Sequence, residues 1–376
     1  LAVSMRKKSM KRSPLMSKDI GLIVIDEAHN LESRVRSSVT TFITMRNLKE
    51  NVYGASRAID VFDESFTAEV DMAEKLIDKA FRLLYKQMVQ QDKIAEENGQ
   101  DIERYYVRQS STVFHNLQKT LANICDKASL AFGAYDGDKH HRNYDEEIEK
   151  LEDCVEFLTS FVRGTQSDDI FWMECPKGNK SVKGVYLYKC PKEVNKITKN
   201  ILFKEEDIQI VLTSATLTSG RADDYRKDYL YFMKNTGFAL DQGYICEPKE
   251  SPFNYDEHAM IYYTENLPHP SKERKRFIEE AVKEIIRLLH ISVGKALILF
   301  TAKTDMQEVY EKLLEEELPF QIFMQLGNEK QAETLEKFRK DTNSVLLGTG
   351  SFWEGINIEG ISLSLESKKF VPLRSQ

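Results

Sequence analysis

The stretch Gly21–Glu32, "GLIVIDEAHNLE", changes within a few residues from an apolar run to a cluster of charge. An uninterrupted apolar run such as 20–25 is typical of a strand in a parallel sheet that helices cover on both faces. Asp26, Glu27 and His29 follow it directly. In open α/β sheets ligands bind beyond the carboxyl ends of the strands. The stretch therefore predicts a strand that ends in a chemical site.

Two acids after a buried strand are typical of a Walker B site for nucleotide hydrolysis. Asp26 would hold Mg²⁺, through water, because this cation prefers carboxylate and water oxygens. Glu27 would orient or deprotonate the water that attacks the γ-phosphate. His29 would face a neighbouring loop instead of the phosphate. The ordinary alternative is a strand end followed by a solvated acidic turn.

Further apolar runs share this character and predict strands, at 208–212, 295–300, 320–324 and 344–348. Amphipathic segments separate the last three, at 304–317 and 329–341, with apolar residues at helical spacing. Strands that alternate with helices predict β-α-β units. The fold class is therefore α/β with parallel sheets.

Between the first two runs the pattern changes to long charged helices. Apolar residues recur at intervals of three and four in 71–97, 102–132 and 143–164. The segment 170–191 then indicates two strands joined by a Gly/Lys/Asn turn. We expect a largely helical insertion between two similar strands.

Two more segments carry polar groups beyond predicted strands. "VLTSATLTSG", residues 211–220, places the hydroxyls of Ser214 and Thr216 where they could bond to His29 or a carboxylate. "LLGTGSFWEGINIEG", residues 346–360, is rich in glycine, which lets backbone approach phosphate closely. Taken alone, these two segments could be an ordinary strand-to-loop transition and a glycine-rich turn.

Composition narrows the class of protein. A net charge of −7 argues against a protein that coats nucleic acid non-specifically, although a local basic channel is compatible with it. No run of eighteen apolar residues predicts a membrane span. The five cysteines form no C-x-x-C pair, which indicates reduced thiols in a cytoplasmic protein. Cys175 with Cys190, or His140 with His141, could bind a metal, but solvated or packed side chains are the simpler interpretation.

The four motifs together resemble those of a known family. "VIDEAHNLE", "LTSATL", "LFTAKTDM" and "GTGSFWEGINIEG" are similar to motifs II, III, IV and V of superfamily-two helicases, and more narrowly to the DinG branch of the XPD/DinG family. The segments 171–191 and 251–268 also resemble that branch. The resemblance covers nearly the whole chain apart from the helices of the insertion.

This resemblance implies two RecA-like domains with parallel sheets, both incomplete here, and a mostly helical arch inserted in the first. Residues 1–32 would be part of motor domain 1, and 33–200 the arch. Residues 201–242 would return to motor domain 1, and 243–376 would form motor domain 2.

The resemblance also implies roles for single residues. Asp26 and Glu27 would serve metal binding and water activation, while His29, Ser214 and Thr216 would couple hydrolysis to movement. The remaining candidates lie in the second domain: Thr301, Lys303, Thr349 and Trp353 toward DNA, and Glu354, Gly355 and Asn357 toward nucleotide. The implied activity is an ATP-dependent DNA helicase of repair or replication that moves 5′ to 3′. It would use ATP and Mg²⁺, act on single-stranded and forked DNA and work as a cytoplasmic monomer; an iron–sulfur cluster stays open, with no ligands in this chain.

Three departures from the family pattern bear on activity. The sequence has no G-x-x-x-x-G-K-[ST]; at its one Gly-Lys pair, Gly294-Lys295, Ala296 replaces the Ser or Thr. It also has no Q-x-x-G-R after residue 360, and Asn357 stands where most members have Asp. We expect the phosphate-binding loop to lie upstream in a longer protein, and this chain alone to be inactive. Alternative interpretations are a non-catalytic DNA-binding or scaffolding module, and the motor part of a nuclease-linked DinG.

Overall fold

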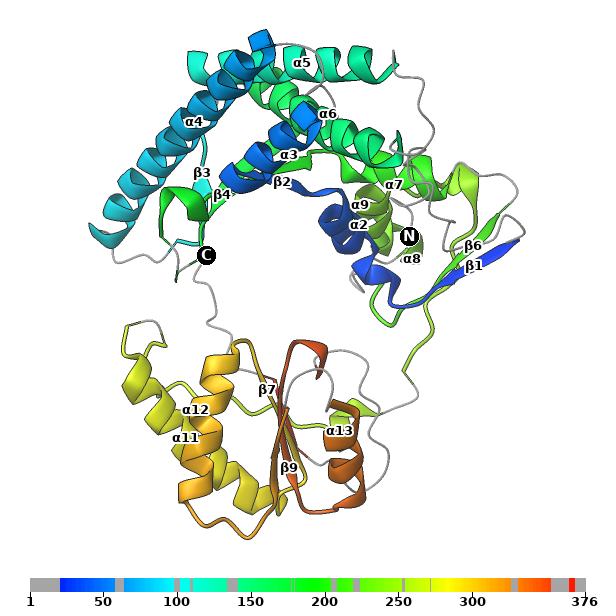
Figure 1. Ribbon diagram of the computed structural model, residues 1–376. Coiled ribbons are helices and arrows are strands. Elements are labelled where there is room, and N and C mark those ends of the chain that lie inside the picture. Colours follow the sequence, from blue (N-terminus) through cyan, green and yellow to red (C-terminus); the bar gives the residue numbers. More distant parts are fainter. Residues whose placement is uncertain are drawn as a thin grey trace. The chain divides into compact units, whose positions relative to one another are not determined.

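The computed structural model describes residues 21–57, 64–97, 102–108, 111–133, 141–176, 178, 180–203, 208–218, 224–251, 254–270, 272–325, 331–352 and 365–368. The chain divides into two compact units, residues 1–250 and 251–376. Figure 1 shows the elements of each unit. The architecture is α/β, with parallel sheets in both units and a mostly helical insertion in the first.

The opening strand lies in a parallel pair. β1 (Leu22–Ile25) runs beside β6 (Gln209–Leu212), with Leu22 opposite Gln209 and Ile25 opposite Leu212. Within the described residues, helices cover only one face of this pair. Leu22 and Val24 are 54% and 59% exposed, because within the described residues only the opposite face packs against other apolar side chains.

The insertion contains an antiparallel sheet of four strands in the order β2-β5-β4-β3. Its strands are β2 (Thr41–Thr44), β3 (Arg104–Tyr106), β4 (Asp169–Glu174) and β5 (Tyr186–Pro191). The hairpin predicted over 170–191 is present as β4 and β5, which pair from Asp169 opposite Pro191 to Glu174 opposite Tyr186. The sequence patterns did not predict β2 or β3, and the helix expected over 102–132 begins only after β3.

Four long helices pack on one face of this sheet (Figure 1). They are α3 (Met45–Arg57), α4 (Glu64–Glu97), α5 (Thr112–Gly133) and α6 (His141–Val162). Tyr105, Met173, Leu187 and Ile43, one from each strand, are buried against the helices. Phe161 joins helix to sheet, because its ring lies edge-on to both Phe114 and Phe171. The insertion therefore has a core of its own.

Shorter helices complete the first unit. α2 (Leu31–Val39) follows the 3-10 turn Ala28–Asn30, α7 (Val194–Leu202) follows β5, and α8 (Tyr225–Asp228) and α9 (Leu230–Thr236) follow β6. Further 3-10 turns are Gly164–Gln166, Val182–Gly184 and Leu240–Gln242. α9 ends at Gly237, with φ 75°, where an added Cβ would meet the Asn195 carbonyl oxygen at 2.3 Å. Glycine is required there because α9 closes against α7.

The second unit is built on a parallel sheet in the order β10-β7-β9-β8. The strands are β7 (Ala296–Phe300), β8 (Ile322–Met324), β9 (Val345–Thr349) and β10 (Leu365–Lys368). The helices are α10 (Tyr255–His258), α11 (Arg274–Ser292), α12 (Lys303–Glu315) and α13 (Gln331–Lys340), and a 3-10 turn spans Gly350–Phe352. The β-α-β alternation predicted from the sequence is confirmed here.

The central strands of this sheet are buried on both faces, as their apolar runs predict. Ile298 and Phe300 pack with α11 and α12, while Leu297 and Leu299 pack with Phe338 of α13 on the other face. One strand was unexpected. β10 has the polar sequence Leu-Glu-Ser-Lys yet pairs in parallel with β7, because backbone groups make the ladder whatever the side chains are. No helix within the described ranges is long and apolar enough to cross a membrane.

Candidate functional site

The acidic turn lies at the carboxyl edge of the β1–β6 pair. The ladder continues past both strands, since the Thr213 N–H donates to the Ile25 carbonyl and the Ala28 N–H to the Thr213 carbonyl, each at 3.0 Å. Because the two strands are parallel, their polar continuations meet at one edge. Glu27 and Ser214, 187 residues apart in the sequence, are thereby brought together.

Glu27 adopts the left-handed conformation, with φ 48° and ψ 42°. This conformation costs an L-residue about 1–2 kcal/mol. Its N–H donates to Asp26 Oδ1 at 2.9 Å, which favours the turn locally. The turn then continues as the 3-10 segment Ala28–Asn30, with Ala28 buried. A strained non-glycine residue of this kind is characteristic of functional sites.

Three side chains meet beyond the turn. His29 Nδ1 lies 2.7 Å from Ser214 Oγ and 3.1 Å from Glu27 Oε2, and the Ser214 hydroxyl donates to Glu27 Oε2 at 3.4 Å. The contact expected between His29 and the Ser214 hydroxyl is present. Thr216 joins through its backbone, whose N–H donates to Ser214 Oγ at 3.3 Å. Movement of any one of the side chains of Glu27, His29 and Ser214 would therefore change its contacts with the other two.

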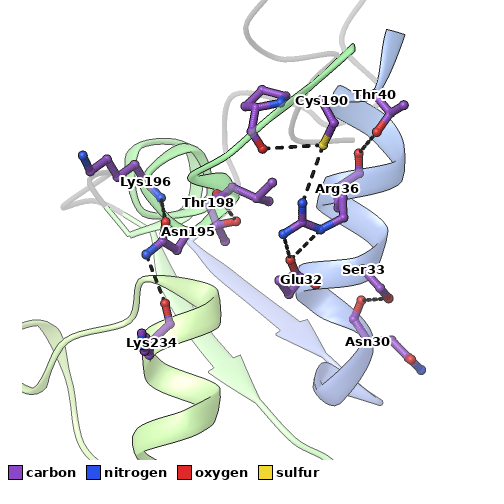
Figure 2. A network of polar contacts seen from close by, with 12 residues as sticks. Asn30, Glu32, Ser33, Arg36, Thr40, Cys190, Asn195, Lys196, Thr198 and Lys234 are labelled. Atoms are coloured by element: carbon purple, nitrogen blue, oxygen red, sulfur yellow. Dashed lines mark hydrogen bonds and ion pairs between the residues drawn. The ribbon is translucent and has the colours of Figure 1, made fainter. Parts of the chain in front are cut away.

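The α2 helix fixes the turn to the rest of the first unit (Figure 2). Leu31 and Val35 pack against Cys190 and Val194. Arg36 Nε donates to Glu32 Oε1 at 2.8 Å, and Arg36 Nη1 lies 3.7 Å from Cys190 Sγ. The hydrogen bond to Glu32 raises the pKa of Arg36, so its positive charge stays in place. The site therefore has a packed inner side and an exposed outer side.

The acids have the donor chemistry that Mg²⁺ requires. Mg²⁺ is usually held by one or two carboxylates, with water and substrate phosphates completing its shell. The side chains of Asp26 and Glu27 are exposed at the sheet edge and could supply those carboxylates. Within the described ranges no group of three or more His, Cys, Asp or Glu forms a closed metal cage. The donor set fits a cation shared with a phosphate ligand better than a structural metal.

Three candidate residues of the second unit lie at the carboxyl edge of its own sheet. Phe300 pairs with Thr349 at the ends of β7 and β9, so Thr301, Lys303 and Thr349 lie at one carboxyl edge. Thr301 and Lys303 are exposed, whereas Thr349 is only 6% exposed. Trp353, Glu354, Gly355 and Asn357 lie outside the described residues.

Gln325 is a residue that the sequence patterns did not single out. It follows β8, and its Oε1 accepts from the Thr349 N–H at 2.7 Å and lies 3.4 Å from Thr349 Oγ1. Its own N–H donates to the Leu347 carbonyl at 2.9 Å. Gln325 thus links the end of β8 to the end of β9, within the glycine-rich segment 346–360. The sequence feature that could have identified Gln325 is its position as a polar residue directly after a predicted strand.

Sequence comparison identifies the second unit. Residues 285–367 match the profile of a helicase C-terminal domain. The chain is 29% identical over 198 residues to the ATP-dependent helicase DinG of Mycobacterium tuberculosis, covering 52% of this chain and 28% of that protein. It is 24% identical over 350 residues to the ATP-dependent DNA helicase YoaA of Haemophilus influenzae, covering 92% of this chain and 49% of that protein.

The chain is thus similar to DinG/XPD-type superfamily-two helicases. Among solved structures, that of S. tokodaii Xpd4 resembles it with a TM-score of 0.51 at 15% identity, over 90% of this chain and 58% of that one. This likeness supports the DinG/XPD-type fold, two RecA-like domains with an arch. The chain spans about a quarter to a half of the length of these two curated relatives.

Proposed function

We propose that this chain is part of an ATP-dependent DNA helicase that couples Mg-ATP hydrolysis to movement on single-stranded DNA, 5′ to 3′, in repair or replication. The observation that carries the proposal is the network of Glu27, His29 and Ser214 at the carboxyl edge of a parallel strand pair. Two relatives named as ATP-dependent helicases support it. So does the match of residues 285–367 to a helicase C-terminal domain.

In this proposal Asp26 binds the metal and Glu27 orients the attacking water. Mg²⁺, when bound with ATP, neutralises charge that develops on the phosphates. The Glu27 carboxylate accepts a proton from, or aligns, the water, and His29 and Ser214 hold that carboxylate in position. Ser214 belongs to the segment after β6. A movement of the Glu27 carboxylate is transmitted to that segment directly through Ser214 and indirectly through His29.

The second unit would contact the DNA backbone. Thr301 and Lys303 are exposed at one sheet edge, where a hydroxyl and an ammonium could meet phosphates. Thr349 would take part through its backbone or after a local rearrangement, because its side chain is buried beside Gln325. Contacts to phosphate without reading bases suit a protein that moves along any sequence.

ATP hydrolysis with and without single-stranded DNA tests this function. The 376-residue chain has no G-x-x-x-x-G-K-[ST], so it should show only background hydrolysis. A longer form that includes such a loop should show DNA-stimulated turnover, and Glu27→Gln should abolish that turnover while ATP binding persists. DNA binding without any turnover in the longer form would instead support the non-catalytic module. Robust turnover by Glu27→Gln would refute the role given to Glu27.

A further inference from the structure

The side chain of Gln325 lies against the last residue of β9, at the carboxyl edge of the second sheet. Its Oε1 accepts a hydrogen bond from the Thr349 N–H at 2.7 Å and lies 3.4 Å from Thr349 Oγ1. Two polar groups of one residue therefore converge on a single neutral oxygen atom. With this contact in place Thr349 is only 6% exposed, so its N–H and hydroxyl are closed to a ligand.

The backbone and the side chain of Gln325 are held in different ways. The backbone N–H continues the ladder between β8 and β9, because it donates to the Leu347 carbonyl at 2.9 Å. The side chain reaches Thr349 through flexible single bonds, and the residue as a whole is half-buried. A change of rotamer would therefore take the amide oxygen away from Thr349 and leave the sheet intact.

An anionic oxygen would compete well for the same two groups. Hydrogen bonds to an ionised acceptor are roughly twice as strong as those to a neutral one, and the amide oxygen of Gln325 is neutral. Thr301 and Lys303 are exposed at this edge, since β7 pairs with β9 from Ala296 to Phe300. The Lys303 ammonium attracts phosphate to the place where Thr349 lies.

We propose that the amide oxygen of Gln325 occupies the position of a phosphate oxygen at Thr349 and leaves it when single-stranded DNA binds. Gln325 is then a competitor of the phosphate at this position. Only molecules in which Gln325 has moved away can bind phosphate at Thr349, so the apparent dissociation constant is the intrinsic one divided by their fraction. This exchange also explains how a buried threonine can contact DNA.

This inference rests on the proposed function, from which it takes the contact between Thr349 and DNA. The exchange itself needs no ATP. DNA that binds equally well whatever residue stands at 325 would therefore overturn the inference and leave the proposed function intact.

Two substitutions of Gln325 should shift DNA affinity in opposite directions. Gln325→Met keeps the length of the side chain but removes the accepting oxygen, so the dissociation constant should fall by between about twofold and tenfold. Gln325→Glu keeps an accepting oxygen and adds negative charge, which binds the Thr349 N–H more strongly and repels phosphate. Its dissociation constant should rise severalfold.

The same two substitutions at Gln321 are matched controls. Gln321 is exposed and precedes β8, whereas Gln325 follows it, so the two lie roughly 13 Å apart at opposite ends of the strand. Fluorescence anisotropy of a labelled twenty-nucleotide oligo(dT), at low salt and without ATP, gives the dissociation constant of the 376-residue chain and of each variant. Circular dichroism checks that each variant folds.

Hydrogen exchange at the Thr349 amide is a second measurement. Without DNA this amide should exchange faster in Gln325→Met than in the wild type, because its acceptor has been removed. Saturating oligo(dT) should restore slow exchange in Gln325→Met, since a phosphate oxygen then accepts from the N–H. Fast exchange that persists in the DNA-bound variant would overturn the proposal.

A supporting role of Gln325 predicts the opposite pattern. Gln325→Met would then bind oligo(dT) more weakly than the wild type, and Gln325→Glu would bind it almost normally. That pattern, or equal constants for the Gln325 and Gln321 variants, would overturn the proposal. Absence of binding by every protein, the wild type included, would overturn the DNA contact of the proposed function and this inference with it.

Discussion

At the scale of single residues, the acidic turn combines chemistry with strain. Glu27 is left-handed although it is neither glycine nor asparagine, and Val293, Lys295 and Glu317 share this property away from the candidate acids. At Glu27 the ladder from Thr213 to Ala28 holds the turn on both sides. The conformation directs the carboxylate toward His29 and Ser214. The backbone conformation that places the Glu27 carboxylate in the site therefore lowers the stability of the fold.

Replacement of Glu27 by glycine tests the strain. Glu27→Gly should raise the free energy of unfolding of the first unit by up to about 1 kcal/mol, because glycine adopts this conformation without a Cβ penalty. Glu27→Gln keeps the Cβ and should change stability by less than about 0.5 kcal/mol. Urea denaturation followed by circular dichroism measures both. A Glu27→Gly variant less stable than Glu27→Gln would show that the turn stores no strain.

Cys154 gives the insertion a dependence on pH. Burial raises the pKa of its thiol to about 11, above the ordinary value of 9.0 for this group. The unfolded chain therefore loses this proton first, and the folded state is the more protonated one between about pH 9 and 11. The stability contribution is complete below pH 9 and is lost as pH rises through 11.

The urea midpoint of the chain should therefore fall between pH 8 and pH 10.5, and it should fall less in Cys154→Ala. Other groups titrate in this range, so the difference between the two proteins is the relevant measurement. Cys246→Ala is the control for removal of a thiol as such, since Cys246 is exposed. Identical slopes for the wild type and Cys154→Ala would contradict the assignment.

At the scale of elements, periodicity predicted helices well and isolated strands poorly. The spacing over 71–97 and 143–164 predicts α4 and α6, and both are present. β3 was taken for helix because its three residues are too short to show alternation. β2 was missed for the same reason. Both are strands because β4 and β5 offer them edges on which to pair.

The contact of α6 with the sheet is an element-scale prediction. Phe161→Ala should destabilise the insertion by about 3–5 kcal/mol, because it removes a fully buried ring that touches Phe114 and Phe171. Phe161→Leu keeps most of the volume and should cost clearly less. Thermal and urea unfolding monitored at 222 nm measure both. Equal losses for the two variants would mean that ring volume is not what holds α6 to the sheet.

At the scale of the whole molecule, the chain consists of two units with separate cores. The buried clusters of the insertion and of the second unit share no residue. Residues 243–251, at the boundary, form neither helix nor strand, and Lys249 is exposed there. A connection of this kind is where proteases act first.

Limited trypsin digestion should therefore cleave early after Lys249 and give fragments that correspond to the two units. Lys249→Gln should slow the appearance of these fragments severalfold and leave cleavage elsewhere unchanged. Mass spectrometry of the time course identifies the cut. Early cleavage within α4 or α11 instead would contradict the division into two units.

The sequence alone determined the local chemistry of this protein. Apolar runs that end in Asp26–Glu27 or Ser214 predicted strands with polar ends. Both the run and its polar end can be read from residues that are adjacent in the sequence. The same holds for the β-α-β order of the second unit. These features depend on neighbours in the chain, so composition and spacing suffice to find them.

Only the tertiary structure decided which distant residues meet. The sequence offered His29 or a carboxylate as partners of the Ser214 hydroxyl, and the pairing of β6 with β1 brings that hydroxyl to both His29 and Glu27. The antiparallel sheet of the insertion likewise depends on the pairing of four strands, two of which were not predicted. Side chains far apart in the sequence become neighbours only when the backbone ladders fix which residues lie opposite.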